Sequence, residues 1–62
     1  MGQRDMMRDL IAKHGNNESQ VCMAYAAAER RGEVNRNSDK YGLTPEDYAR
    51  RLWRDGLKKG WF

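Results

Sequence analysis

Cysteine, histidine, proline and phenylalanine each occur only once in the 62 residues of this chain. The single cysteine, Cys22, excludes an internal disulfide bond. Because there is also only one histidine, His14, the chain lacks the set of ligands that a structural zinc site requires. We therefore expect no metal ion and no other cofactor.

Long apolar runs are also missing. No segment approaches the ~20 consecutive apolar residues of a membrane span, and the first residues do not resemble a signal peptide. The mean hydropathy is −1.09. These absences predict a reduced, soluble, cytoplasmic protein that does not contact a membrane.

Groups suited to catalysis are scarce. We expect Cys22 on the buried side of a helix, where no second histidine or acid forms a relay with it. His14 lies near the predicted end of a helix and is typical of a packing or capping residue. The sequence contains no glycine-rich phosphate-binding loop. It therefore predicts a protein that is not an enzyme and has no small-molecule substrate.

The composition nevertheless indicates a folded chain. Hydrophobic residues make up 39% and charged residues 34%, and two tryptophans and three tyrosines argue against disorder. A chain of this size buries only ~60% of its unfolded surface. We expect residues 1–62 to form one small domain, with a thin core that is stabilised further by a partner or a second copy.

Start and stop signals predict three helices, at about residues 3–14, 18–31 and 45–59. Asn17 and Thr44 suit helix N-caps, and Pro45 suits the first position of a helix. Glycines at the ends of the three segments are typical helix stops. Residues 33–42 show no periodicity and predict an irregular basic loop. The expected fold is all-α, a small three-helix domain with this loop before the third helix.

The first two predicted helices are joined by a short turn, as in a helix-turn-helix motif. In that motif the exposed residues early in the second helix read base edges, and here these are Glu18, Ser19, Gln20 and Met23. No basic residue precedes Arg30 in this helix, which disfavours sequence-specific reading through it.

The segment 18–31 is apolar around more of its circumference than one core face needs. Its predicted core stripe is Val21, Cys22, Tyr25 and Ala28, and we place Met23, Ala26 and Ala27 away from that stripe. Two interpretations remain open for the outer residues: small helix-forming surface residues, or a second helix–helix contact. The aromatic pair at the end of the chain either folds back over the core or presents a binding hot spot. The candidate partner interface is formed by Met23, Ala27, Trp61 and Phe62.

The last thirteen residues, RRLWRDGLKKGWF, separate into two faces on a helical wheel. Leu52, Trp53 and Leu57 are expected to close the core. A basic stripe occupies the opposite face and consists of Arg50, Arg51, Arg54 and Lys58. This stripe is either a solvated face or a phosphate-binding one. The first interpretation is favoured by the i,i+4 spacing of three acid–base pairs: Glu46–Arg50, Asp47–Arg51 and Asp55–Lys59.

Positive charge is concentrated in the second half of the chain. Residues 30–62 contain nine basic and five acidic residues, whereas residues 1–29 contain three and four. Further basic residues that could extend the stripe are Arg30, Arg31, Arg36 and Lys40. The leading hypothesis is a small non-enzymatic module, nucleic-acid-binding or regulatory, that contacts the phosphate backbone of DNA or RNA. The alternative is a protein-interaction subunit or homodimer.

Overall fold

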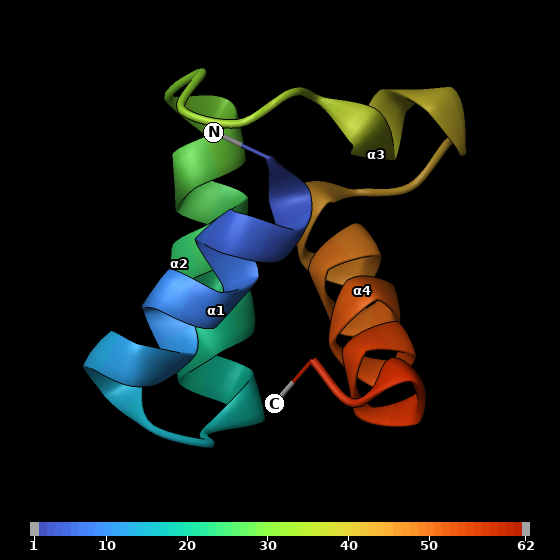
Figure 1. Ribbon diagram of the computed structural model, residues 1–62. Helices are drawn as coiled ribbons and strands as arrows, with labels where there is room; N and C mark the ends of the chain where they lie inside the picture. Colours follow the sequence, from blue (N-terminus) through green and yellow to red (C-terminus); the bar gives the residue numbers. More distant parts are fainter. Residues whose placement is uncertain (1, 62) are drawn as a thin grey trace.

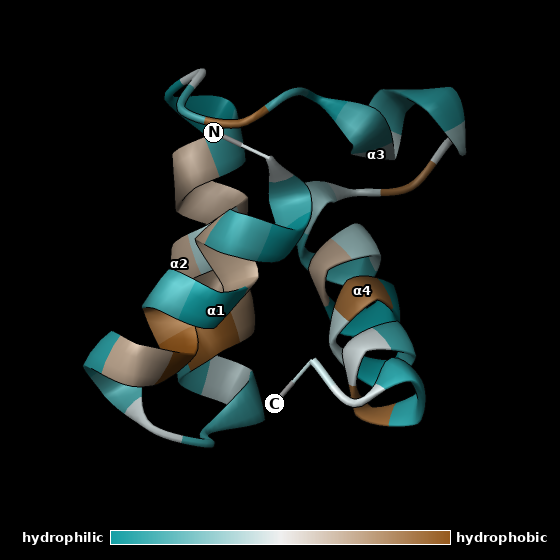
Figure 2. Ribbon diagram, viewed as in Figure 1, coloured by the Kyte–Doolittle hydropathy of each residue, from teal (hydrophilic) through white to brown (hydrophobic). Residues whose placement is uncertain are grey.

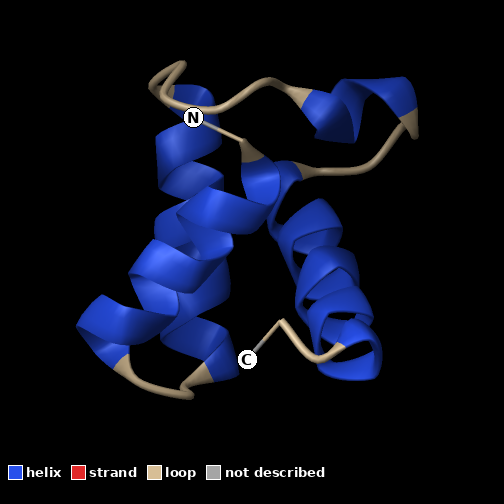
Figure 3. Cartoon of the chain, viewed as in Figure 1, coloured by secondary structure: helices blue, strands red, loops and turns tan. Residues whose placement is uncertain are grey.

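The computed structural model describes residues 2–61 and confirms the all-α class. The chain forms α1 (Gln3–His14), α2 (Glu18–Arg30), α3 (Asn37–Lys40) and α4 (Pro45–Lys59), as Figure 1 shows. Over the described range there is no β-strand (Figure 3). The three predicted helices are present, and α2 ends one residue earlier than expected.

The helix boundaries follow the predicted caps. The Asn17 side chain accepts a hydrogen bond from the Gln20 amide at 3.1 Å, and the Thr44 hydroxyl accepts one from the Asp47 amide at 3.2 Å. These bonds satisfy amides that the first turn of a helix leaves unpaired. Gly60 ends α4 with φ 72° and ψ 33°, a left-handed conformation that favours glycine.

Helix α2 is the centre of the molecule, because both α1 and α4 pack against it. In Figure 1, α1 crosses in front of α2, and α4 stands beside them. Figure 2 shows α2 as largely apolar and α3 as hydrophilic. The buried core includes Met6, Met7, Val21, Cys22, Tyr25, Ala28, Val34, Tyr48, Ala49, Leu52 and Trp53. The predicted core stripe of α2 is therefore confirmed in full.

Two residues were placed wrongly by the sequence patterns. Ala26 is fully buried, because α2 contacts a helix on each of two sides and its buried arc is wider than one stripe. Leu57 is 56% exposed, although it was expected to close the core. On the wheel of α4 it lies at the margin of the apolar half, next to Arg50, and the helix turns it outward.

The predicted irregular loop contains the short helix α3. Its Ser38 hydroxyl donates a hydrogen bond to Glu29 of α2, and both residues are fully buried. After α3, the ring of Tyr41 stacks on that of Tyr48, with centroids 5.7 Å apart and an interplanar angle of 13°. A four-residue helix is too short to produce a periodic pattern. Contacts with α2 and α4 specify it instead.

Candidate functional site

The four residues of the predicted basic stripe lie together on the outer face of α4. They line a hollow of about 500 Å³, which we call the basic hollow. Its walls are Leu43, Asp47, Arg50, Arg51, Arg54, Asp55 and Lys58. The opposite face of α4 is buried against the core. Burial of that face therefore turns the four cations outward together.

The cations of the basic hollow form no ion pair with the described acids. Among the described residues, none of the expected pairs Glu46–Arg50, Asp47–Arg51 and Asp55–Lys59 lies within 4.0 Å, so that prediction is wrong. The two acids of the hollow leave it with an excess of positive charge. Exposed i,i+4 pairs stabilise a helix by only a few tenths of a kcal/mol, so little free energy opposes the open arrangement.

Glu46 binds Arg30 rather than Arg50. The Arg30 guanidinium donates two hydrogen bonds to the Glu46 carboxylate, at 2.5 and 2.8 Å, and joins the end of α2 to the first turn of α4. Chiefly because of this hydrogen bonding, the pKa of Glu46 falls to about 2. The same pair raises the pKa of Arg30. Arg30 is therefore engaged within the fold.

The other basic residues that were expected to extend the stripe differ in whether they form ion pairs. Arg31 contacts Glu33 at 2.5 Å, and Arg36 contacts Asp39 at 3.8 Å. Lys40 is exposed and forms no ion pair within residues 2–61. None of Arg30, Arg31, Arg36 and Lys40 lines the basic hollow. The structure thus brings together the four residues of α4 and leaves the other four outside.

An exposed tyrosine adjoins the basic hollow. Tyr41 is 57% exposed, and the Arg51 guanidinium lies 5.3 Å from the centroid of its ring. Tyr41 also stacks on Tyr48, which fixes its orientation. An aromatic ring beside phosphate-binding cations is a common surface for nucleobase stacking. Sequence patterns did not indicate this tyrosine, because Tyr41 lies in a segment without periodicity.

Cys22 is buried in the core and only 2% exposed. Burial raises the pKa of its thiol to about 11; Glu18 adds to the effect and Arg50 opposes it. The thiol therefore stays protonated. Within residues 2–61, no cluster of three or more histidine, cysteine or acidic side chains is arranged to hold a metal ion.

The residues of the candidate partner interface do not form one exposed patch. Met23 is 65% exposed, whereas Ala27 is half-buried. Trp61 folds back against the core, and its amide donates to the Gly56 carbonyl at 2.9 Å. Phe62 lies outside the described residues. Of the two interpretations of the chain end, the structure supports folding back for Trp61.

None of the described helices is long and apolar enough to cross a membrane. The chain matches no known protein family, no curated protein and no solved structure.

Proposed function

We propose that the protein is a non-enzymatic nucleic-acid-binding module that holds the phosphate backbone in the basic hollow. The observation that carries this proposal is the convergence of Arg50, Arg51, Arg54 and Lys58 on one exposed hollow without ion pairs to the described acids. Arginine and lysine side chains supply most phosphate contacts in protein–nucleic acid complexes. Unpaired cations are free to take up such contacts without first breaking a salt bridge.

Tyr41 supports a single strand as the preferred form. The bases of a duplex are stacked inside it, whereas those of a single strand are open to an aromatic ring. Because Tyr41 contacts Arg51, a base on the ring and a phosphate on the hollow are compatible with one bound strand. Arg30, Arg31 and Arg36 act as structural cations in this arrangement, and Lys40 adds positive charge next to Tyr41.

A matched pair of double variants tests the proposal. Arg54→Gln/Lys58→Gln removes two charges from the basic hollow, and Arg8→Gln/Lys13→Gln removes two exposed charges from α1. Binding of fluorescent single strands is measured at several salt concentrations. For the variant in α4 we expect weaker binding and a slope of log K against log salt that is flatter by about 1.4, since each lost phosphate contact on a single strand removes about 0.7.

The variant in α1 must bind like the parent protein. Equal weakening by both double variants would show that net charge alone attracts the strand. Absence of binding to single strands and duplexes at low salt would contradict the proposed function as a whole.

Self-association is a second candidate function, favoured by Met23 of α2 and Leu57 of α4, which are large apolar side chains that the described fold leaves exposed. Burial of apolar surface would drive such a dimer. Sedimentation at several concentrations tests it. We expect a dimer whose dissociation constant is higher in Met23→Asp and is unchanged in the surface control Ser19→Asp. A monomer at every concentration would rule this candidate out.

A further inference from the structure

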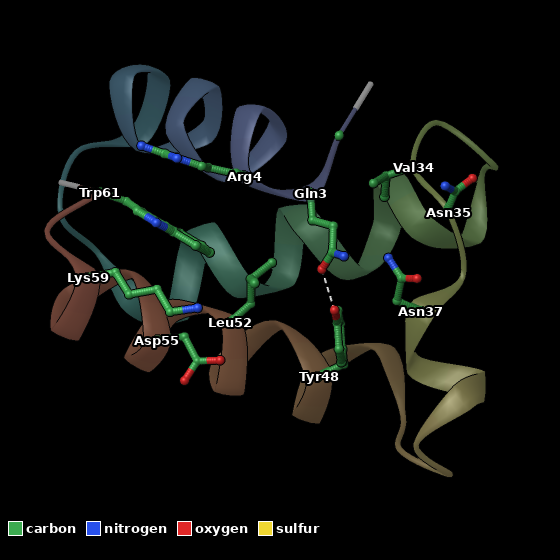
Figure 4. Close-up of a pocket in the computed structure, with 11 residues that line it drawn as sticks. Gln3, Arg4, Val34, Asn35, Asn37, Tyr48, Leu52, Asp55, Lys59 and Trp61 are labelled. Carbon is green, nitrogen blue, oxygen red and sulfur yellow. Dashed lines mark hydrogen bonds between the residues drawn. The ribbon is translucent and has the colours of Figure 1, made fainter.

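A second hollow lies on the other side of α4, between that helix and α1. Figure 4 shows it as a groove whose far end is bordered by residues 34–37. Its volume is about 520 Å³, within the range of ~300–1,000 Å³ that is usual for small-molecule sites. Asp55 lines both this groove and the basic hollow. We call this second hollow the α1–α4 groove.

An unpartnered amide faces the groove at one end. Asn37 is only 8% exposed, and its side chain lines the groove without a hydrogen bond to any described residue. Its amide atoms are not among the buried side-chain atoms that lack a partner, so they are open to the groove. The Asn37 side chain is therefore available to a ligand.

A second carboxamide is held near it. The Tyr48 hydroxyl donates a hydrogen bond to the Gln3 Oε1 atom, as the dashed line in Figure 4 shows. This bond orients the Gln3 side chain and leaves its Nε2 donor groups unused. A carboxamide presents a donor and an acceptor side by side, which matches the N6 donor and N7 acceptor of adenine.

The other end of the groove is positively charged. Figure 4 shows Trp61 between Arg4 and Lys59, whose charged groups lie 5.5 and 5.6 Å from the indole centroid. Neither cation has an ion pair within residues 2–61. Because the indole lies between them, one phosphate cannot contact both cations. Figure 4 shows the Lys59 amine on the side of the indole that faces Leu52, so Lys59 is the cation placed for a phosphate in the groove.

The middle of the groove joins these two ends. Leu52 supplies apolar surface there, and the Asp55 carboxylate has no ion pair with a described cation. Figure 4 shows the Asp55 carboxylate turned away from Leu52 and from α1, so it does not face the middle of the groove. The order along the groove is thus carboxamides, apolar surface and cations.

We propose that the α1–α4 groove binds an adenine nucleotide, with the base at Asn37 and Gln3 and the phosphate at Lys59. The nucleotide is either free or the terminal unit of a strand, since both carry the same groups. This proposal does not rest on the proposed function, because the two sites use different cations. The sequence predicts no small molecule here, since three separated segments build the groove.

The test is an NMR titration of the full chain with adenosine 5′-monophosphate, uridine 5′-monophosphate and ribose 5-phosphate. We expect the adenine nucleotide to shift the amide signals of Asn37 and Leu52 and the indole signal of Trp61. Ribose 5-phosphate should bind at least about tenfold more weakly, because it lacks a base. Uridine 5′-monophosphate should also bind more weakly, because its single ring buries less apolar surface against Leu52 than the two rings of adenine do. A short RNA that ends in adenosine distinguishes the strand end from the free nucleotide as the source.

Asn37→Leu removes the unpartnered amide. We expect adenosine 5′-monophosphate to bind about tenfold or more weakly to this variant, whereas the thermal midpoint stays equal or rises because no hydrogen bond is lost. The control is Asn16→Leu, an exposed asparagine in the turn between α1 and α2. Should Asn37→Leu fail to fold, the NMR signals that shift in the parent protein decide whether the nucleotide binds beside Asn37.

The variant Arg54→Gln/Lys58→Gln must bind adenosine 5′-monophosphate like the parent protein, even if it no longer binds strands. Loss of nucleotide binding in that variant would place the nucleotide in the basic hollow and overturn this proposal. Equal binding of all three small molecules, or no shift at Asn37 and Trp61 with any of them or with the RNA, would also overturn it.

Discussion

At the scale of single residues, the Arg30–Glu46 ion pair decides which cations are available for binding. Glu46 lies four residues before Arg50, at the spacing of a helical ion pair. It contacts Arg30 instead, through two hydrogen bonds. As a result Arg50 forms no ion pair with Glu46 and remains available in the basic hollow. Glu46 instead links α2 with α4.

This ion pair predicts a pH dependence of stability. The pair lowers the pKa of Glu46 from 4.5 to about 2, so the folded state favours the ionised carboxylate. The resulting stabilisation is complete above pH 4.5 and is lost as the pH falls from there to about 2. In urea unfolding at several pH values, Glu46→Gln should therefore be less stable than the parent protein at pH 7 and equally stable near pH 2.

The control for that measurement is Asp9→Asn, which removes an exposed carboxylate that forms no ion pair among residues 2–61. It should unfold like the parent protein at pH 7. A constant difference between Glu46→Gln and the parent across the whole pH range would show that the ion pair does not cause the effect.

At the scale of elements, α4 combines a buried face with an exposed binding face. Leu52 is 7% exposed, and Leu57, five residues later, is 56% exposed. Leu52→Ala should lower the free energy of unfolding by about 2–5 kcal/mol, because it leaves a cavity in the core. Leu57→Ala should change it by no more than about 0.5 kcal/mol.

Urea unfolding of these two variants also checks the orientation of α4. Equal destabilisation by both substitutions would mean that Leu57 is buried as well, and that the basic stripe is turned away from the direction described above. A domain of this size has a free energy of unfolding of only about 3–9 kcal/mol. Unfolding of Leu52→Ala is therefore best measured at low temperature, in a titration that starts from zero urea.

The elements that could be predicted from sequence are those with local signals. The caps at Asn17 and Thr44 involve residues three positions apart, so the sequence alone indicates them. The same holds for the basic stripe, since α4 is long enough for its period to be recognised. Helix α3 and the partner of Glu46 depend on contacts between distant segments, and for this reason the sequence did not reveal them.

At the scale of the whole molecule, the two candidate sites occupy neighbouring hollows separated by α4. The four cations of the basic hollow all come from α4, and the stripe that they form was predicted from that helix alone. The α1–α4 groove needs α1, the segment around α3 and the end of the chain, and no pattern within any one of them indicates it. Packing of α1 and α4 on α2 creates the groove.

The Ser38–Glu29 hydrogen bond has a consequence for how the molecule opens. The segment from Arg31 to Thr44 is fixed by this bond, by Val34 in the core and by the Tyr41–Tyr48 stack, while the Arg30–Glu46 pair holds its two ends together. Because these attachments are few, we expect the segment to detach as a unit at a lower free energy than global unfolding. Asn37 belongs to this segment, so we expect the carboxamide end of the α1–α4 groove to open while the three long helices stay packed.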